Sequence, residues 1–173
     1  GEGWNLAIES IEVVNDYAYI AADPINAGFQ VVNVSDRSNP SLSGYYASPY
    51  EVGQTLVAGN YLYLASPNGL WIYNLSTPDN PTLVDYYPQE RQPKQIFFEG
   101  GYLYESFELP GREIHIIDAS KPSNLNHVGT YKANGFPFDH YVKDNVLYLL
   151  DTQRAWQTGK IIVYWLEIVD VSN

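Results

Sequence analysis

Cysteine and methionine are both absent from this 173-residue chain. Without cysteine there is no disulfide scaffold, no thiolate nucleophile and no cysteine-ligated metal. The absence of methionine, even at the first position, indicates a chain that has been processed or excised. The opening residues Gly1-Glu2-Gly3 carry no signal peptide. A processed chain of this kind fits a mature secreted protein, so we expect an extracellular or cell-surface location.

Positive charge and long apolar runs are also scarce. The chain has 9 Lys and Arg against 20 Asp and Glu, which gives a net charge of −11. An acidic surface repels phosphate backbones, so we expect no nucleic-acid partner. The longest apolar-rich stretch, Ile161 to Val171, is interrupted by Glu167 and Asp170. It is shorter than the roughly 18 apolar residues of a membrane span, so we predict a strand there and no span.

Aromatic residues, in contrast, are abundant: 16 Tyr, 6 Phe and 4 Trp. Such residues favour twisted sheets that pack face to face. The stretch Asn60 to Pro88 shows their arrangement most clearly. It predicts strands over Tyr61–Ala65, Leu70–Leu75 and Thr82–Tyr87, because breaks rich in Pro, Asn, Gly, Ser and Asp separate these runs.

The same unit recurs four times along the chain. Its third strand ends in Asn or Asp, and Ser follows two residues later. The four strand ends are Asn33, Asn74, Asp118 and Asp170. A Tyr-x-Tyr strand precedes the third strand in the first three units, and Val146-Leu147-Tyr148 takes its place in the fourth. A predicted outer strand follows the third strand in the first three units. Four strands repeating about every 40–45 residues are typical of a propeller blade.

The repeated motif resembles that of the LVIVD-repeat family of β-propellers. Three segments carry it most clearly: Glu167-Ile168-Val169-Asp170-Val171-Ser172, Ile116-Ile117-Asp118 and Val31-Val32-Asn33. The resemblance implies an all-β propeller fold and a secreted or surface-anchored microbial protein. The sequence departs from the motif at Asn33 and Asn74, where the family favours Asp, and at Leu125, where Pro is expected.

We therefore predict an all-β fold of four propeller blades of about four antiparallel strands each, as a single β-propeller domain or a propeller segment. The predicted blades span residues 8–50, 51–89, 90–135 and 136–173. The predicted inner strands are Ile8–Val14, Val52–Ala58, Pro93–Glu99 and Phe138–Lys143. In the last blade we expect a longer connection between the second and third strands, around Asp151 to Lys160.

The last blade is predicted to lack its outermost strand, because Asn173 follows the third strand closely. A bare third strand presents an open edge, and open edges recruit partner strands. Two interpretations remain open: the chain belongs to a longer propeller, or another chain completes the blade.

Ligands of propellers usually bind on the channel face, where loops between blades gather. The candidate ligand-binding residues there are Tyr50, Glu51, Arg91, Lys94, Arg112, Asp139, His140 and Trp156. Aromatic rings beside Arg and carboxylates can stack on and hydrogen-bond a sugar. His140 beside Asp139 is the one pair placed for acid–base chemistry. His115 and His127 are expected to be structural or surface residues.

No motif for nucleophilic catalysis or metal binding occurs, so we expect no catalytic residues, no metal and no cofactor. Asn33-Val34-Ser35 and Asn74-Leu75-Ser76 match N-glycosylation sequons. The alternative is that these Asn side chains close a turn after the strand.

The function predicted from these features is that of a non-enzymatic extracellular or cell-surface structural or interaction module, self-assembling through its incomplete blade. Outward-facing rings of Tyr45-Tyr46 and Tyr86-Tyr87 favour protein contacts, although strand propensity alone explains them too. Two alternatives remain. One is a carbohydrate-binding or carbohydrate-active domain that uses the channel face, and the other is a fragment of a larger secreted propeller.

Overall fold

The computed structural model describes residues 8–22, 27–107, 111–154 and 161–172, and these residues form β-strands and turns. Within the described ranges, no helix is both long enough and apolar enough to cross a membrane. The chain divides into two compact units, Gly1–Gln92 and Pro93–Asn173. Each unit holds two antiparallel sheets.

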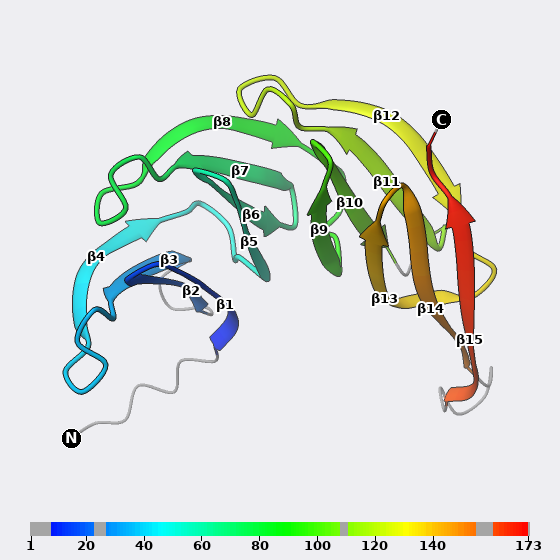
Figure 1. The fold of residues 1–173 in the computed structure, drawn as a ribbon, viewed down its shortest axis with the longest axis horizontal. Coiled ribbons are helices and arrows are strands. Elements are labelled where there is room, and N and C mark those ends of the chain that lie inside the picture. Colours follow the sequence, from blue (N-terminus) through cyan, green and yellow to red (C-terminus); the bar gives the residue numbers. More distant parts are fainter. Residues whose placement is uncertain (1–7, 23–26, 108–110, 155–160, 173) are drawn as a thin grey trace. The chain divides into compact units, whose positions relative to one another are not determined.

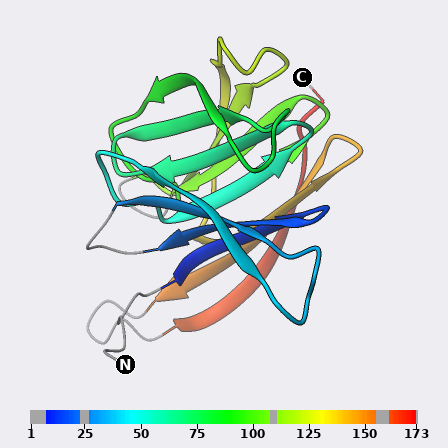
Figure 2. The same ribbon diagram turned by 90° about the vertical axis from the view of Figure 1, so that its left-hand side faces the viewer.

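In the first unit, both sheets have four strands that pair in chain order (Figures 1 and 2). The first sheet consists of β1 (Ile8–Val14), β2 (Tyr17–Ala22), β3 (Gly28–Asn33) and β4 (Ser41–Ala47). The second sheet consists of β5 (Gln54–Ala58), β6 (Tyr61–Ser66), β7 (Gly69–Asn74) and β8 (Thr82–Pro88).

In the second unit, a four-stranded sheet is followed by a three-stranded one. The third sheet consists of β9 (Gln95–Glu99), β10 (Tyr102–Phe107), β11 (Glu113–Asp118) and β12 (Asn126–Lys132). The fourth sheet consists of β13 (Phe136–Lys143), β14 (Val146–Arg154) and β15 (Ile161–Asp170). The prediction of an all-β fold with an incomplete last blade is therefore confirmed. That the four repeats form a single domain stays a prediction.

Two details of the last blade differ from the sequence-based prediction. Its inner strand begins at Phe136 instead of Phe138, because Phe136 and Pro137 continue the ladder beyond a bulge. The long connection expected from Asp151 onward is also wrong at its start, since β14 runs through Asp151 to Arg154. In the second and third sheets the inner strands begin two residues later than predicted, at Gln54 and Gln95.

A register shift recurs in each complete sheet, where the third strand pairs with the fourth. It lies between Val31 and Val32, between Ile72 and Tyr73, and between Ile116 and Ile117. One residue of each outer strand is thereby left without a partner, as in a β-bulge. A bulge of this kind bends the outer strand and increases its twist.

The Asn or Asp that ends each third strand closes the following turn with its side chain. Its Oδ1 accepts a hydrogen bond from the backbone N–H of the Ser two residues later. The four bonds measure 2.9 Å for Asn33–Ser35, 2.6 Å for Asn74–Ser76, 2.9 Å for Asp118–Ser120 and 2.9 Å for Asp170–Ser172. The side chain thus serves the turn in all four repeats, with or without a charge.

Each unit has an apolar core between its two sheets. In the first unit, Tyr19, Phe29 and Val31 of the first sheet pack with Leu62 and Leu64 of the second. The core of the second unit contains Tyr104 and Ile114 of the third sheet, with Val142, Leu147 and Leu149 of the fourth. One face of the first and third sheets is therefore covered by the sheet that follows.

Candidate functional site

The fourth sheet exposes an apolar face that consists of five large side chains. These are Tyr141 (50% exposed), Tyr148 (38%), Tyr164 (60%), Leu166 (58%) and Ile168 (65%), and we call them the open face. Tyr141, Tyr148 and Ile168 form one row across the three strands, since each is paired with the next. Contiguous apolar surfaces of this kind often mark sites of protein contact.

Two of these repeat positions are buried in the first and third sheets. Tyr148 corresponds to Tyr19 and Tyr104, which are 1% and 3% exposed. Leu166 corresponds to Phe29 and Ile114, which are both 0% exposed. These counterparts pack against a following sheet, so the open face occupies the repeat positions of a blade-packing surface but is exposed among the described residues.

One face of the first sheet packs on the second sheet, and the other face is uncovered. We call this uncovered side the reverse face. Its exposed members are Ile11 (53%), Val13 (58%) and Leu42 (62%). Val13, Ala18, Val32 and Leu42 form one row across the sheet. In the second sheet the equivalent row is Val57, Leu62, Tyr73 and Leu83. Leu62 and Tyr73 of that row belong to the core shared with the first sheet.

The strand β15 also has a free edge. It is ten residues long and, among the described strands, pairs with β14 alone (Figure 1). Its backbone N–H and C=O groups on the other side therefore have no strand partner within the described ranges, as the sequence predicted.

A pair of buried carboxyl groups lies on the other face of the fourth sheet. Asp151 of β14 is 0% exposed and Glu167 of β15 is 9% exposed. Asp151 lies two residues after Leu149 in β14, and Glu167 lies two residues before Val169 in β15, so both point to the same inward side as these core residues. In the sequence, Asp151 lies at the start of the expected long connection and Glu167 interrupts an apolar strand. An acidic residue in an inward-facing register is the signal that could have revealed the pair.

The Glu167 carboxylate accepts four hydrogen bonds. Tyr131 O–H donates to Oε2, while Oε1 accepts from the Asn134 backbone N–H (3.1 Å), the Asn134 side-chain amide (2.7 Å) and Trp165 Nε1–H (3.2 Å). Asp151 Oδ2 accepts from the Gly135 N–H at 3.0 Å, whereas Asp151 Oδ1 is buried without a donor. The pair thus links β14 and β15 to β12 and to the segment that leads into β13.

The two carboxyl groups have opposite pKa shifts. Burial raises the pKa of Asp151 to about 7, and the hydrogen bond with Glu167 acts in the same direction. Burial would also raise the pKa of Glu167, but hydrogen bonds from Asp151, Tyr131, Trp165 and Asn134 outweigh it and lower that pKa to about 2. Asp151 is therefore the member of the pair that holds a proton.

The predicted site residues of the second unit are dispersed. His140 is buried and its Nε2 lies 3.0 Å from the Tyr104 carbonyl oxygen, whereas Asp139 is exposed on the opposite face of β13. Burial lowers the pKa of His140, so this imidazole is neutral at pH 7. The two side chains are not joined by a hydrogen bond, and His140 instead belongs to the packing between β13 and the third sheet.

The two basic residues predicted for this unit contact aromatic rings. Lys94 Nζ lies 5.0 Å from the ring centre of Phe138. Arg112 lies 4.4 Å from the ring of Phe136 and donates through Nη1 to the Asn134 carbonyl oxygen at 3.4 Å. Arg112 therefore reaches the segment that the carboxyl pair also holds.

The remaining predicted ligand-binding residues have other placements. Tyr50 and Glu51 are exposed in the connection between β4 and β5, and Arg91 is half-buried after β8. Trp156 lies outside the described residues. The outward rings of the Tyr pairs contact their own sheet: Tyr45 O–H donates to the Ala27 carbonyl (2.9 Å) and Tyr86 O–H to the Asn68 carbonyl (2.5 Å).

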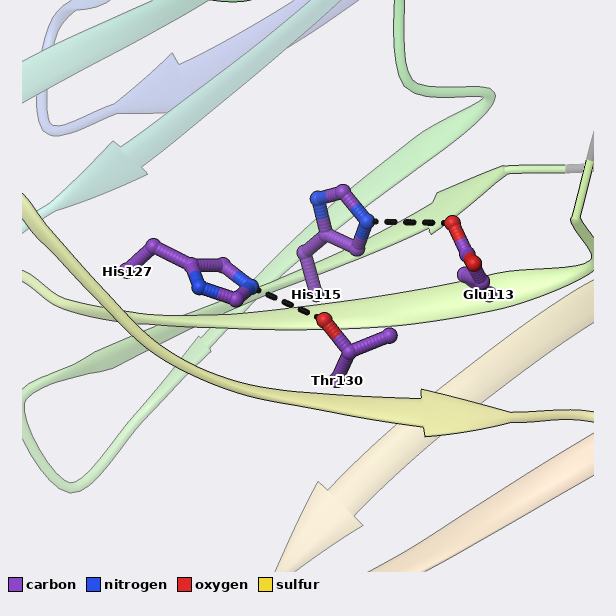
Figure 3. Close-up of polar contacts among 4 residues, drawn as sticks. All are labelled: Glu113, His115, His127 and Thr130. Atoms are coloured by element: carbon purple, nitrogen blue, oxygen red, sulfur yellow. Dashed lines mark hydrogen bonds and ion pairs between the residues drawn. The ribbon is translucent and has the colours of Figure 1, made fainter.

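Figure 3 shows two histidines on neighbouring strands of the third sheet. His115 Nε2 lies 3.3 Å from a carboxylate oxygen of Glu113, and His127 Nε2 lies 2.9 Å from the Thr130 hydroxyl. The two rings are 5.1 Å apart, edge to face. Among the described residues, no group of three His, Asp or Glu side chains could hold a metal ion.

Comparison with solved structures supports the propeller architecture. The computationally designed Ika4 protein matches at a TM-score of 0.66 and 12% identity, over 95% of this chain and 93% of that one. The designed Ika8 protein matches at 0.65 and 12%, over 86% of this chain and 44% of its own. A functionally unknown protein from Desulfotomaculum acetoxidans DSM 771 matches at 0.64 and 13%, over 96% and 57%. These likenesses concern the fold alone.

No curated protein sequence matches this chain. The LVIVD repeat, however, matches it three times, over residues 8–48, 52–88 and 91–133. These matches correspond to the first three sheets and cover more than half of the chain, so the protein belongs to the LVIVD-repeat family.

Proposed function

We propose that this protein is a non-enzymatic interaction module of the cell surface or extracellular space, which assembles head to tail. In this assembly the open face of one copy receives the reverse face of the first sheet of a second copy. The extracellular part of the proposal is supported by the LVIVD repeats, because the sequence resemblance to this family implies a secreted or surface-anchored protein.

The observation that carries the proposal is the exposure of Leu166 and Ile168. At 58% and 65% they are the blade-packing residues of their sheet, and their counterparts Phe29 and Val31 are both 0% exposed. Fully burying one such side chain contributes about 1.5–3 kcal/mol. A partner that covers the open face would therefore gain several such contributions.

The second copy is the occupant that fits, because the chain itself carries the complementary surface. Within the first unit, Tyr19 and Val31 pack with Leu62 and Tyr73. The reverse face presents the equivalents of Leu62 and Tyr73, namely Ala18 and Val32, in one row with the exposed Val13 and Leu42. Two unlike faces that complement each other give a heterologous contact, which forms rings or open chains.

The test uses two Lys substitutions, one on each face. Ile168→Lys on the open face and Val13→Lys on the reverse face should each yield monomers by size exclusion with light scattering. An equimolar mixture of the two variants should give a 1:1 dimer, because each variant retains one intact face. The wild-type chain should form larger species as its concentration rises.

Leu83→Lys serves as the matched control, since Leu83 is 53% exposed on β8 of the second sheet and belongs to neither the open face nor the reverse face. It should assemble like the wild type. A wild-type chain that stays monomeric at all concentrations overturns the proposal. Assembly that survives both Ile168→Lys and Val13→Lys also overturns it and points to strand addition at the β15 edge.

A further inference from the structure

The carboxyl pair lies directly behind the open face. Glu167 lies between Leu166 and Ile168 in β15, and successive side chains of a strand point to opposite faces. Leu166 and Ile168 are exposed on one face, while Glu167 is buried on the other. Whatever holds Glu167 in place therefore also holds the strand that carries the open face.

The contacts of Glu167 tie β15 to one short segment. Asn134 donates to Glu167 through both its backbone N–H and its side chain, and Gly135 donates to Asp151. The approach at Gly135 is close, because a Cβ there would lie 2.7 Å from Trp165 Cζ2 and 2.8 Å from the Thr152 carbonyl oxygen. The segment Asn134–Gly135 is thus held between two strands by hydrogen bonds and by the indole ring.

The unpaired atom of this arrangement is Asp151 Oδ1, which is buried without a donor. A bound cation does not suit it, because the neighbouring Glu167 oxygens are already occupied by four donors. A proton suits this oxygen, because Asp151 protonated at Oδ1 can donate to the Glu167 carboxylate. If both groups were ionised, two negative charges would lie side by side in a buried place, which is unfavourable.

We propose that Asp151 and Glu167 share one proton and form a pH-sensitive clamp, which holds β15 to the Asn134–Gly135 segment more tightly in mild acid than at neutral pH. The clamp itself stands on the geometry of the second unit. Its consequence, that pH regulates the open face, rests on the proposed function.

The other charged and titratable groups around the pair do not take up this proton. From β12, Tyr131 donates to Glu167, and burial together with that bond raises the pKa of Tyr131 to about 12. From the turn before β11, Arg112 reaches the carbonyl oxygen of Asn134. From the segment before β13, Asp151 is contacted by the backbone N–H of Gly135, a residue with no side chain and hence no titratable group. Within the described residues, therefore, titration between pH 4 and 8 at this place belongs to Asp151.

The direction of the pH effect follows from the two shifts. The pKa of Asp151 is raised, so its contribution to stability is complete below the ordinary value of 3.8 and is lost as the pH rises to about 7. The pKa of Glu167 is lowered, so its contribution is complete above 4.5 and is lost as the pH falls toward 2. The clamp is therefore tightest near pH 4 to 5 and weakens up to about pH 7.

Hydrogen exchange measured by mass spectrometry on β15 peptides tests the clamp directly. In the wild-type chain, the opening constant corrected for intrinsic exchange should rise between pH 5 and pH 7, by at most about tenfold per pH unit. In Asp151→Asn it should change less than twofold, because the amide donates permanently to Glu167 and still accepts from Gly135. Glu167→Gln should be less protected at both pH values, since its NH₂ faces donors.

Asp139→Asn is the matched control, because it removes one exposed carboxylate from the neighbouring β13. It should keep the wild-type slope. An Asp151→Asn variant with the wild-type slope, or an Asp139→Asn variant that loses it, would overturn the clamp.

The regulatory consequence has a separate measurement that uses the assembly itself. Wild-type association should be at least fivefold stronger at pH 5.5 than at pH 7.5, and Asp151→Asn should lose this difference. If exchange confirms the clamp while association has the same pH dependence in both proteins, the clamp stands and its regulatory role is overturned. Exchange on the monomeric Ile168→Lys variant keeps the test of the clamp independent of assembly.

Discussion

The third and fourth sheets present the same repeat positions in opposite surroundings. Ile114 of β11 is 0% exposed, whereas Leu166, at the same position of β15, is 58% exposed. The two residues are of similar size and both lie in apolar strands. What differs is that a following sheet packs on the third sheet. In a repeat protein, burial is thus a property of the neighbouring repeat, and the repeat sequence alone does not determine it.

The largest expected effect is the difference in stability between two truncations, one at Ile114 and one at Leu166. Ile114→Ala should lower the free energy of unfolding by about 2–5 kcal/mol, because it opens a cavity in a packed core. Leu166→Ala should change it by less than about 0.5 kcal/mol in the monomer. Denaturant unfolding of both variants in an Ile168→Lys background measures the difference. Equal losses at the two positions would contradict the comparison.

A second test concerns two glycines, one from each side of the junction between these sheets. Gly135→Ala should cost about 1–3 kcal/mol, since the new methyl group would overlap Trp165 and the Thr152 carbonyl. Gly129→Ala should be neutral or slightly stabilising, because its Cβ would lie 3.7 Å from Ile116 Cδ1, an ordinary contact. Thermal unfolding of the two variants compares them. Similar melting temperatures would show that the Asn134–Gly135 segment is not tightly held.

The smallest expected effect concerns a feature that all four sheets share. Asn74→Ala removes the acceptor of the Ser76 N–H, in an exposed turn, and should cost about 0.5 kcal/mol. Asn74→Asp should cost nothing measurable, because Asp118 and Asp170 make the same bond. Melting temperatures of the two variants provide the check. A loss in Asn74→Asp as large as in Asn74→Ala would mean that the amide has a further role.

Most of the fold could be predicted because the same pattern of strands and turns occurs four times in the sequence. The strand Ile8–Val14 has the predicted bounds, and β6 and β7 differ from the prediction by single residues at their ends. The extension of β13 back to Phe136 could not be predicted, because a proline such as Pro137 lacks the N–H that a strand ladder uses. It depends on pairing with Thr152 and Asp151 across a bulge, which is a long-range feature.

The site was less predictable than the fold. Loop residues such as Tyr50 and Lys94 were chosen for their chemistry, but a sequence does not show which loops meet. The carboxyl pair could not be predicted, because Asp151 lies at the start of the expected connection and Glu167 is a single polar residue in an otherwise apolar strand. Only the register of β14 with β15 shows that both residues point inward, where a carboxylate requires donors or a proton.

The recurring bulge of the outer strands has a consequence for the edge of β15. In each complete sheet, a single outer-strand residue is left over opposite the middle of the third strand, between positions that correspond to Ile168 and Val169. A strand that completed β15 in the same manner would need the same extra residue. Flat strands, including those of unfolded or misfolded chains, lack it and would lose register there. A strand that completed this edge as the other outer strands do would be bent there, and the flat stacking by which exposed edges aggregate would break that pairing.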